Sequence, residues 1–438
     1  MSGALLTDLY ELKMAASYLR HDMTGQATFS LFARKLPPSR GFLVTAGLAA
    51  CLDFLESFSF DRDDLAYLAD VEKLPPETVE LFRKLRFTGD VWAMPEGQVV
   101  YAGEPLLEVT APIAEAQLVE TVLLNHMTFQ TSVATKAARC VLAAGGADLI
   151  DFAFRRTQGI DAAMAVARTT AIAGFSATSN VEAARRYGLQ AVGTMAHSYI
   201  EAFGDERTAF ETFALDHGGI TTFLVDTYDT VAGVRAVIDV VRRLRLPGTV
   251  GVRLDSGDLA QLARKARQLL DGSGLQEARI LASGGLDEYA IADLVAQNAP
   301  IDAYAVGTKV GVSADAPYLD SAYKLVEYDD CPVMKLSPGK ITAPGKKQVF
   351  RGLYADVVGL RSEKAPPGHV PLLVAVMREG HRLTPAEPLA EVSKRCAAAL
   401  ARLPEAARAL HEPVPPPVRQ SPSLTRLCTQ VRAALAAA

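Results

Sequence analysis

The sequence predicts an α/β protein that combines an irregular parallel α/β barrel with an α/β sandwich domain built from N-terminal and returning C-terminal segments. Three observations point to this fold class. Between residues 147 and 309, short apolar runs alternate with helix-like stretches, a pattern typical of parallel strands under right-handed crossovers. Most of these runs end in a polar or glycine-rich cluster. Mixed strand-like and helix-like segments precede this region, and strand-like segments return after it.

The N-terminal part, residues 1–135, is expected to form the α/β domain. Residues 9–19 have helical apolar spacing, residues 27–33 have the composition of a strand, and residues 89–109 form an apolar run punctuated by Gly and Pro. Residues 118–144 combine helical apolar spacing with the absence of proline, so they predict a long helix that leads into the next unit.

The barrel is expected over residues 136–322. Its polar clusters fall at the carboxyl ends of the strands, which favours a barrel over a doubly wound open sheet, where ligands would gather at one switch point. The strand candidates are residues 147–154, 191–197, 221–228, 249–256, 279–285 and 303–309.

The C-terminal segment, residues 323–438, is predicted to return in part to the N-terminal domain. Strand-like pieces occur at residues 324–330, 331–337 and 355–361. The end of the chain has the composition of a peripheral helical tail, preceded by an exposed Pro-rich linker at residues 413–423.

Composition narrows the class of protein. The 438 residues, 49% hydrophobic and 22% charged, predict a folded chain with more than one packed unit. A net charge of -5 argues against broad phosphate neutralisation, so we expect no nucleic-acid partner. The start has acidic residues and no secretory pattern, no apolar run is long enough to span a bilayer, and the five cysteines are scattered. These features predict a cytoplasmic protein with reduced thiols and no membrane association.

Two glycine-rich turns predict a phosphate site. Ser283, Gly284 and Gly285 end one strand candidate, and Gly307 and Thr308 end the next. Glycine lets backbone N–H groups approach a phosphate closely. A single glycine turn is usually no more than a turn, but two on successive strand–helix units favour phosphate binding.

Charged residues at two other strand ends are further candidates. Arg253 and Asp255 alternate on one strand and so face the same side, which suits an anionic substrate with a metal-bound pyrophosphate; the alternative is a surface salt bridge. Arg155 and Arg156 end another strand candidate beside Phe152 and Phe154, so one arginine could take a negative group while one of the two phenylalanines stacks on an aromatic ring; the alternative is a solvated charged face.

His197 ends one strand candidate and begins a helix. A lone histidine is more often structural, but the end of a barrel strand favours a functional role. Thr194 and Ser198 flank it, and Asp226 ends the next strand candidate; we assign all three to the substrate site.

Taken in order, these clusters resemble the motif series of the nicotinate phosphoribosyltransferase family. The resemblance spans Thr7 to about Lys324, and several motifs in a fixed order are more specific than any one of them. It implies a type II phosphoribosyltransferase fold and a homodimer with active sites at the subunit interface. The motifs are TDLYEL, DFAFRRTQG, GTMAHSYIEAFG, LVDTYDT, GVRLDSGDL, ASGGLDEY and AVGTKVG.

The resemblance also implies roles for residues. Tyr10 of the partner subunit would stack on nicotinate opposite Phe152, and His197 matches the family's phosphorylated histidine. Ala153 stands where the family usually has glycine. Arg155 and Arg253 would line the pocket for phosphoribosyl pyrophosphate (PRPP) and nicotinate, Asp255 would serve the metal-pyrophosphate end, and the 5'-phosphate would bind Gly284, Gly285, Gly307 and Thr308.

The implied activity forms nicotinate mononucleotide and pyrophosphate from nicotinate and PRPP, with coupled ATP hydrolysis, Mg²⁺ as cofactor and ATP as co-substrate, in NAD biosynthesis. Such a reaction needs positioning and charge neutralisation rather than a protein nucleophile at carbon, which fits a site rich in arginine, aspartate and backbone amides. The alternatives are a nicotinamide phosphoribosyltransferase, a quinolinate phosphoribosyltransferase, which does not use ATP, and a phosphate-binding metabolite sensor without turnover. Loss of His197, Arg253 or Asp255 would favour the sensor, and all three are present.

Overall fold

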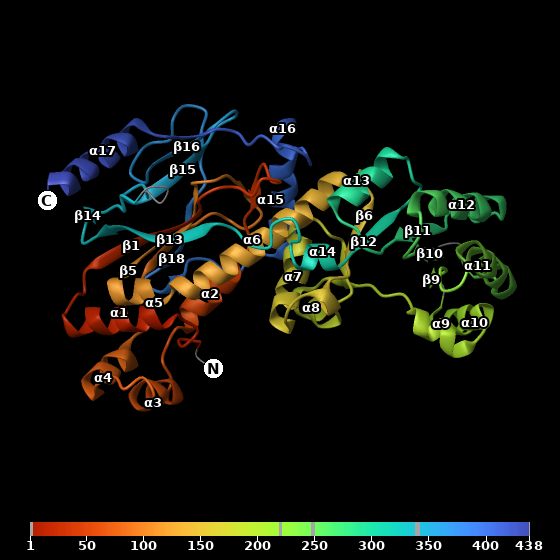
Figure 1. Cartoon of the computed structure of the whole chain (residues 1–438), viewed down its shortest axis with the longest axis horizontal. Helices are drawn as coiled ribbons and strands as arrows, with labels where there is room; N and C mark the ends of the chain where they lie inside the picture. The colour runs from red at the N-terminus through yellow and green to blue at the C-terminus, as the bar shows by residue number, and fades with distance from the viewer. Residues whose placement is uncertain (1–2, 219–220, 247–249, 338–341, 438) are drawn as a thin grey trace. The chain divides into compact units, whose positions relative to one another are not determined.

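A computed structural model describes residues 3–218, 221–246, 250–337 and 342–437 (Figure 1). The chain divides into two compact units. Met1–Thr135 and Tyr318–Ala438 form the first unit, and Lys136–Pro317 form the second.

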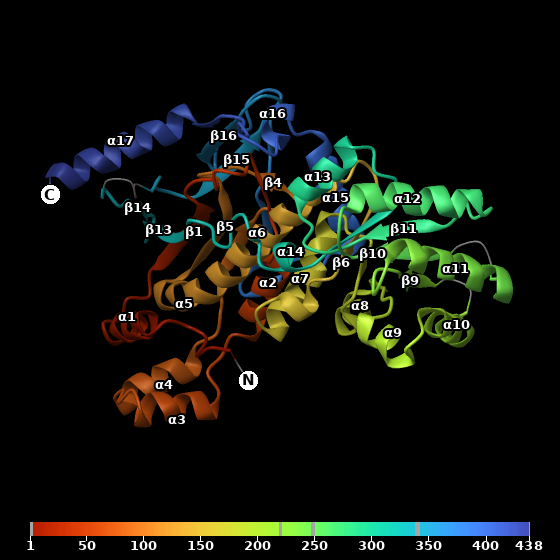
Figure 2. The ribbon, with the colours of Figure 1, turned by 45° about the vertical axis from the view of Figure 1, so that its right-hand side comes forward.

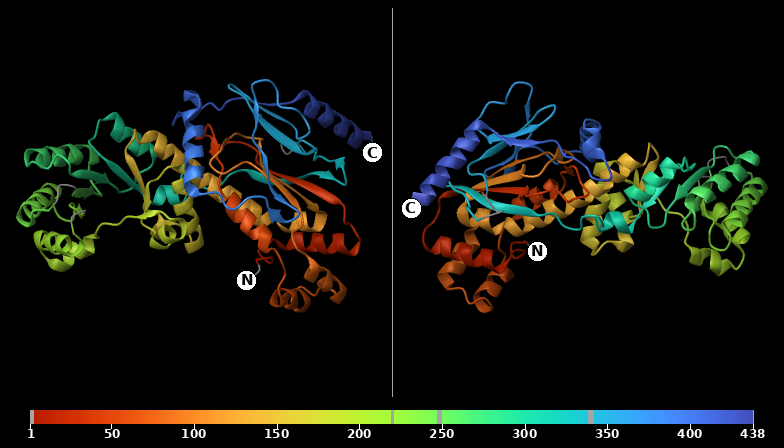
Figure 3. Two further views of the ribbon diagram at one scale, coloured as in Figure 1. Left: turned by 180° about the vertical axis from the view of Figure 1, so that it is seen from behind. Right: turned by 45° about the horizontal axis from the view of Figure 1, so that its top comes forward.

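The first unit is built on a seven-stranded antiparallel sheet that joins both ends of the chain. An N-terminal strand, β1, pairs with a strand of the returning segment, β13, and on its other side with β5. Figure 3 shows the blue C-terminal segment beside the red and orange N-terminal strands. In spatial order the strands are β14 (Cys331–Pro332), β13 (Ser321–Tyr328), β1 (Gln26–Ala33), β5 (Pro105–Pro112), β3 (Asp90–Ala93), β18 (Val374–Arg378) and β19 (His381–Arg382).

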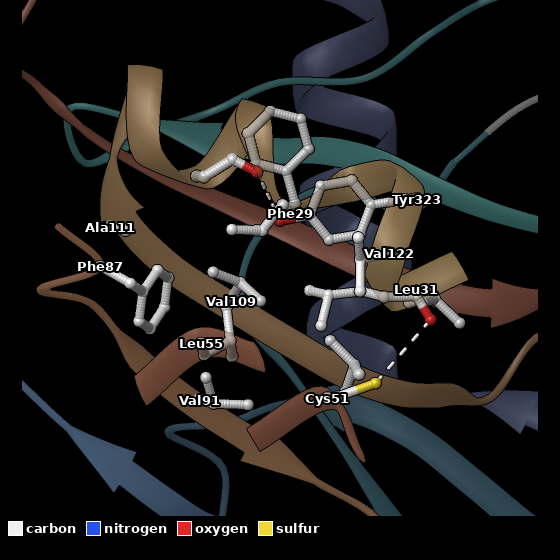
Figure 4. Packing of buried hydrophobic residues seen from close by; sticks show 14 of the residues in the cluster. Phe29, Leu31, Cys51, Leu55, Phe87, Val91, Val109, Ala111, Val122 and Tyr323 are labelled. Carbon is white, nitrogen blue, oxygen red and sulfur yellow. Dashed lines mark hydrogen bonds between the residues drawn. The ribbon is translucent and has the colours of Figure 1, made fainter. Parts of the chain in front are cut away.

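Aromatic contacts pack the core of the first unit (Figure 4). Phe29 of β1 stacks on Tyr323 of β13, with ring centroids 4.7 Å apart. The Tyr323 hydroxyl donates to the backbone oxygen of Ala116 at 2.8 Å, so this buried polar group is satisfied. The core therefore contains residues from both ends of the chain, as a sandwich with a returning segment requires.

The first unit also contains helices, and one of them continues into the second unit. The predicted long helix is present as α6 (Glu120–Ala143). The others are α1 (Leu9–Arg20), α2 (Leu48–Ser57), α3 (Arg62–Asp70), α4 (Pro76–Lys84), α5 (Ile113–Leu118), α15 (Leu389–Ala401), α16 (Glu405–Arg408) and α17 (Pro422–Ala437).

Two smaller sheets complete the first unit. The pair β2 (Leu43–Val44) and β4 (Val99–Val100) forms one, and the other has the spatial order β17 (Val370–Pro371), β15 (Lys347–Arg351), β16 (Asp356–Leu360) and β20 (Val418–Gln420). Since β20 pairs with β16, the Pro-rich linker predicted at residues 413–423 is in part a strand. Proline lacks the backbone N–H that hydrogen bonds between strands require. The strand β20 accordingly begins after the run of prolines, and it lies at the edge of its sheet.

The second unit contains a curled parallel sheet of seven strands. Apart from β8 and β9, strands that are consecutive in sequence lie side by side, and the first, β6, pairs with the last, β12. This is the order of a barrel that stays open between β8 and β9, so the predicted irregular barrel is confirmed. In spatial order the strands are β8 (Gln190–Ala191), β7 (Ala177–Thr178), β6 (Asp148–Asp151), β12 (Ala303–Val306), β11 (Arg279–Ala282), β10 (Gly251–Leu254) and β9 (Thr222–Leu224).

Helices connect these strands, and several begin at an aspartate cap. Asp229, Asp258 and Asp287 each accept a backbone N–H of the first turn of the following helix. Figure 2 shows the first two of these helices, α11 and α12, beside β9, β10 and β11. The helical segments are η1 (Phe154–Arg156), α7 (Ile160–Ala173), α8 (Val181–Tyr187), α9 (His197–Phe203), α10 (Glu206–His217), α11 (Thr230–Leu244), α12 (Leu259–Gly272), α13 (Glu288–Ala296) and α14 (Thr308–Gly311).

Three local predictions were wrong. The strand expected over residues 191–197 is present only as β8, which ends at Ala191, because β8 lies at the open edge of the sheet and pairs only with β7. Strand β7 itself was missed, since its two residues lack a valine- or isoleucine-rich run. Arg155 lies in the 3₁₀ turn η1 rather than at the end of β6. Thr249, where the prediction for β10 began, lies outside the described residues.

Candidate active site

The carboxyl ends of four neighbouring strands, β6, β12, β11 and β10, surround a cavity of about 130 Å³. Most of the residues predicted for phosphate and substrate binding line it. The lining residues are Phe152, Arg155, Arg156, Arg253, Asp255, Ser283, Gly284, Gly285, Ala305, Gly307 and Thr308.

A buried carboxylate shapes the loop that carries Phe152 and Arg155. Asp151, the last residue of β6, accepts hydrogen bonds from the Ala153 backbone N–H at 2.8 Å and from the Thr178 hydroxyl at 2.7 Å. Burial raises the pKa of the Asp151 carboxyl, although both hydrogen bonds oppose that rise. Asp151 therefore fixes the start of the loop and joins it to β7.

Ala153 is accommodated without a glycine. Its backbone has φ -84° and ψ -19°, in a region open to every residue. The space comes from Gly311 of α14, where an added Cβ would lie 2.9 Å from the Ala153 Cβ and 2.6 Å from the Thr157 hydroxyl oxygen. The close approach of α14 thus depends on glycine at 311.

Arg253 is the centre of the polar network. It is only 8% exposed, so the alternative of a surface salt bridge does not describe it. Its Nε donates to Ser283 Oγ at 2.8 Å, Nη1 to Thr194 Oγ1 at 3.1 Å and Nη2 to Asp255 Oδ1 at 2.7 Å. The guanidinium carbon also lies 5.3 Å from the centroid of the Phe152 ring. The side chain is therefore held in one orientation beside the cavity.

Asp255 is kept ionised. Burial opposes its charge, but hydrogen bonds from Ser283 and Arg253, together with the arginine charge, lower the pKa of the carboxyl below its usual value. The carboxylate is thus negative at neutral pH, as a ligand for a cation must be.

The first glycine turn packs directly on this strand end. Gly284 has φ +91°, and a Cβ there would lie 2.0 Å from the Asp255 backbone oxygen. Gly285 has φ +66° and open space around the position of a Cβ. The turn therefore requires glycine at 284 for both conformation and close approach, and at 285 for conformation alone.

His197 begins α9 and faces the same carboxylate. Its Nδ1 lies 3.1 Å from Thr227 Oγ1, and its Nε2 lies 4.0 Å from Asp255 Oδ2. The imidazole is 42% exposed, so it is accessible to a ligand while Thr227 orients it.

Asp226 supports the end of β10. Its Oδ2 accepts from the Asp255 backbone N–H at 3.0 Å and from Ser256 Oγ at 2.6 Å. Its Oδ1 is buried and has no hydrogen-bond partner within the described part of the chain. Asp226 therefore has one carboxylate oxygen, Oδ1, that is available to a bound ligand.

The remaining predicted residues lie elsewhere. Ser198 is exposed beside His197, and Tyr10 lies in α1 of the first unit, 47% exposed. Two residues were not predicted, namely Ala305, which lines the cavity, and Thr227, which contacts His197. For Thr227, its position next to Asp226 was the available signal.

The described residues contain no cluster of three or more His, Cys, Asp or Glu side chains placed to hold a metal ion. Nor do they include a helix long and apolar enough to cross a membrane.

A parallel half-barrel with glycine turns, a buried arginine and paired carboxylates at its strand ends is typical of enzymes that act on phosphorylated substrates. Comparisons with known proteins define the group. The N-terminal domain model of nicotinate phosphoribosyltransferase (NAPRTase) matches residues 5–128, and the NAPRTase family model matches residues 147–300. The chain belongs to the nicotinate phosphoribosyltransferase family.

Relatives support this over most of the chain. It is 49% identical over 387 residues to a nicotinate phosphoribosyltransferase of Mycobacterium tuberculosis, covering 87% of this chain and 83% of that protein. It is 44% identical over 360 residues to the nicotinate phosphoribosyltransferase of Bacillus subtilis, covering 80% and 73%. The crystal structure of human nicotinic acid phosphoribosyltransferase superposes with a TM-score of 0.86 at 27% identity, covering 97% and 99%.

Proposed function

We propose that the protein is a nicotinate phosphoribosyltransferase, which forms nicotinate mononucleotide and pyrophosphate from nicotinate and PRPP in the salvage route to NAD. The family membership supports this, and so does the cavity in which the buried Arg253 lies between Phe152, Ser283 and Asp255. Five free cysteines suit the reducing cytoplasm, which we infer as its compartment.

The 5'-phosphate of PRPP is proposed to bind the two glycine turns. Gly284, Gly285, Gly307 and Thr308 all line the cavity, and backbone N–H groups in such turns bind phosphate oxygens. The carbon–nitrogen bond forms at C1 of the ribose while its bond to pyrophosphate breaks. Arg155, Arg156 and Arg253 would stabilise the negative charge that develops on the leaving group.

Nicotinate is proposed to stack on Phe152, with its carboxylate directed to the arginines. The partially exposed Phe152 and the small Ala305 side chain supply the apolar part of the cavity wall. We propose that Tyr10 of the partner subunit stacks on the opposite face of the nicotinate ring. Leu6, Leu9 and Tyr10 are 65%, 44% and 47% exposed, which fits an N-terminal segment covered in a homodimer.

The carboxylates of the site fit a magnesium ion. Asp255 is ionised, and Asp226 Oδ1 is a buried oxygen without a described partner. Oxygen ligands of this kind, with substrate phosphate oxygens, suit Mg²⁺. Asp255 and Asp226 would hold the ion, which when bound neutralises the charge of the pyrophosphate. The Asp255 backbone N–H donates to Asp226 Oδ2 and so helps to orient the Asp226 carboxylate.

His197 is proposed to couple ATP hydrolysis to the reaction. Thr227 contacts Nδ1, so Nε2 faces the Asp255 side of the site. In the proposed step Nε2 attacks the γ-phosphorus of ATP, a nitrogen–phosphorus bond forms, and the bond to ADP breaks. Water later removes the phosphoryl group as inorganic phosphate and regenerates the imidazole.

One assay tests the proposed function. Purified protein is given PRPP and Mg²⁺ with nicotinate, nicotinamide or quinolinate, each with and without ATP, and mononucleotide is measured. We expect the highest kcat/KM with nicotinate, because cationic side chains favour a carboxylate over an amide. Equal or higher efficiency with nicotinamide or quinolinate would reject the assignment, and PRPP binding without product would indicate a sensor.

A further inference from the structure

An ion pair joins the two glycine turns. Asp287 ends the turn that contains Gly284 and Gly285, and Lys309 directly follows Thr308 of the other turn. The Lys309 Nζ lies 2.8 Å from Asp287 Oδ2. The two side chains come from different strand–helix units, so their contact links the ends of β11 and β12.

Asp287 is held firmly for this contact. Its second oxygen, Oδ1, accepts the Ala290 backbone N–H at 3.0 Å and thereby caps α13. Burial disfavours the charge, but Lys309 and the cap bond lower the pKa of the carboxyl. An ionised carboxylate with a fixed orientation is therefore presented to the lysine.

The neighbouring residue anchors the same turn from the buried side. Glu288 is fully buried, 2.6 Å from Lys136 Nζ and 2.9 Å from Arg139 Nε, both on α6. Lys136 Nζ also lies 3.3 Å from Asp315, which follows α14. Lys136 thus supports the helices behind both turns from the interior, while Lys309, 41% exposed, joins the turns nearer to solvent.

We propose that Lys309 is a positioning residue, whose ion pair with Asp287 holds the two turns at the separation that a bound phosphate requires. Thr308 lines the cavity, whereas the Lys309 ammonium is directed to Asp287, so the lysine acts through the turns. This inference rests on the proposed function, because the phosphate in question is the 5'-phosphate of PRPP.

Two single variants and their combination test this role. Lys309→Met removes the ammonium and keeps much of the side-chain length, and Asp287→Asn removes the charge while asparagine still caps a helix. We expect each to raise the KM for PRPP about tenfold, with kcat and the KM for nicotinate nearly unchanged. The double variant should resemble either single variant, because both remove the same contact. Lys309→Arg should restore most of the affinity.

PRPP binding by calorimetry, without nicotinate, separates this inference from the proposed function. Weaker binding in both single variants, without an additive loss in the double variant, supports the inference even if the wild-type protein makes no nicotinate mononucleotide. If Lys309→Met weakens binding but Asp287→Asn does not, the lysine contacts the phosphate itself and the positioning role is wrong. Unchanged PRPP binding in both variants would also overturn it. Melting temperatures within a few degrees of the wild type would verify that the variants fold.

Discussion

Arg253 and Asp255 lie two residues apart at the end of β10 and share a 2.7 Å ion pair, with the Ser283 hydroxyl bonded to both side chains. Strand alternation places them on the same side. The pair belongs to the wall of a cavity and is connected to the first glycine turn through Ser283. The guanidinium group of Arg253 bonds Ser283 and Asp255 through different nitrogen atoms, so its branched shape matters more to the site than its positive charge alone.

Replacement of Arg253 by lysine is therefore expected to be severe. A lysine keeps the charge but cannot bond Ser283, Thr194 and Asp255 together. We expect Arg253→Lys to lower kcat/KM by about 100-fold or more. Steady-state kinetics on folded protein, verified by circular dichroism, checks this. A variant with half of the wild-type efficiency would contradict it.

The two glycines of the first turn should differ in sensitivity. Gly284→Ala introduces a Cβ 2.0 Å from the Asp255 backbone oxygen, in addition to a left-handed φ. Gly285→Ala has the left-handed φ but open space. We expect Gly284→Ala to lose most activity and more than about 2 kcal/mol of stability, and Gly285→Ala to lose only about 1 kcal/mol. Denaturant unfolding measures both, and equal losses would argue against close packing of the turn.

Mixing two impaired variants, each lacking one residue of the proposed site, tests whether the site is shared between subunits. Tyr10→Ala would lack the residue that we propose stacks on nicotinate from the partner subunit, a contact worth about 1 kcal/mol beyond burial, and should weaken nicotinate binding more than PRPP binding. His197→Ala would lack the residue that we propose is phosphorylated. A mixed dimer holds one site with both residues intact, so subunit exchange should restore part of the ATP-dependent activity. Complete absence of recovery in verified mixed dimers would contradict the interface site; Tyr10→Phe serves as the active control.

Glu206 makes stability depend on pH. Burial, and then the nearby Asp205, Asp229 and Asp226, raise the pKa of its carboxyl to about 7. The folded state thus binds more protons than the unfolded state between its ordinary pKa of 4.5 and about 7, and stability falls as pH rises through this window. Glu206→Gln should have a higher Tm than the wild type at pH 8 and lose that advantage at pH 4. The exposed control Glu182→Gln should not reproduce this difference.

The sequence predicted the fold class because a parallel sheet carries repeated local signals. Apolar runs such as residues 279–282 are followed by glycine-rich or charged clusters. The alternation of these runs with helices determines the order of the strands. The return of β13 to pair with β1 was visible only as a strand-like run, because a pairing across 288 to 301 positions leaves no local pattern. Strand β7 has two residues and no distinctive composition, so it could not be found.

The candidate site was predictable where chemistry follows strand ends, as for Arg253, Asp255 and the glycine turns. Contacts that depend on three-dimensional packing were not. Thr227 orients His197 across 30 positions, and Lys309 meets Asp287 across 22. Both pairs join neighbouring segments through side-chain geometry, which neither spacing nor composition encodes.

Coupling of ATP to phosphoribosyl transfer through His197 is the central claim, and one variant tests it most directly. His197→Asn can keep a hydrogen bond to Thr227 but cannot form a phosphohistidine. Incubated with γ-labelled ATP, the wild-type protein is expected to gain acid-labile label and to make nicotinate mononucleotide faster with ATP than without. The variant is expected to fold normally, to remain unlabelled, and to retain only slow, ATP-independent synthesis. Undiminished ATP hydrolysis with full ATP stimulation in His197→Asn would contradict the account.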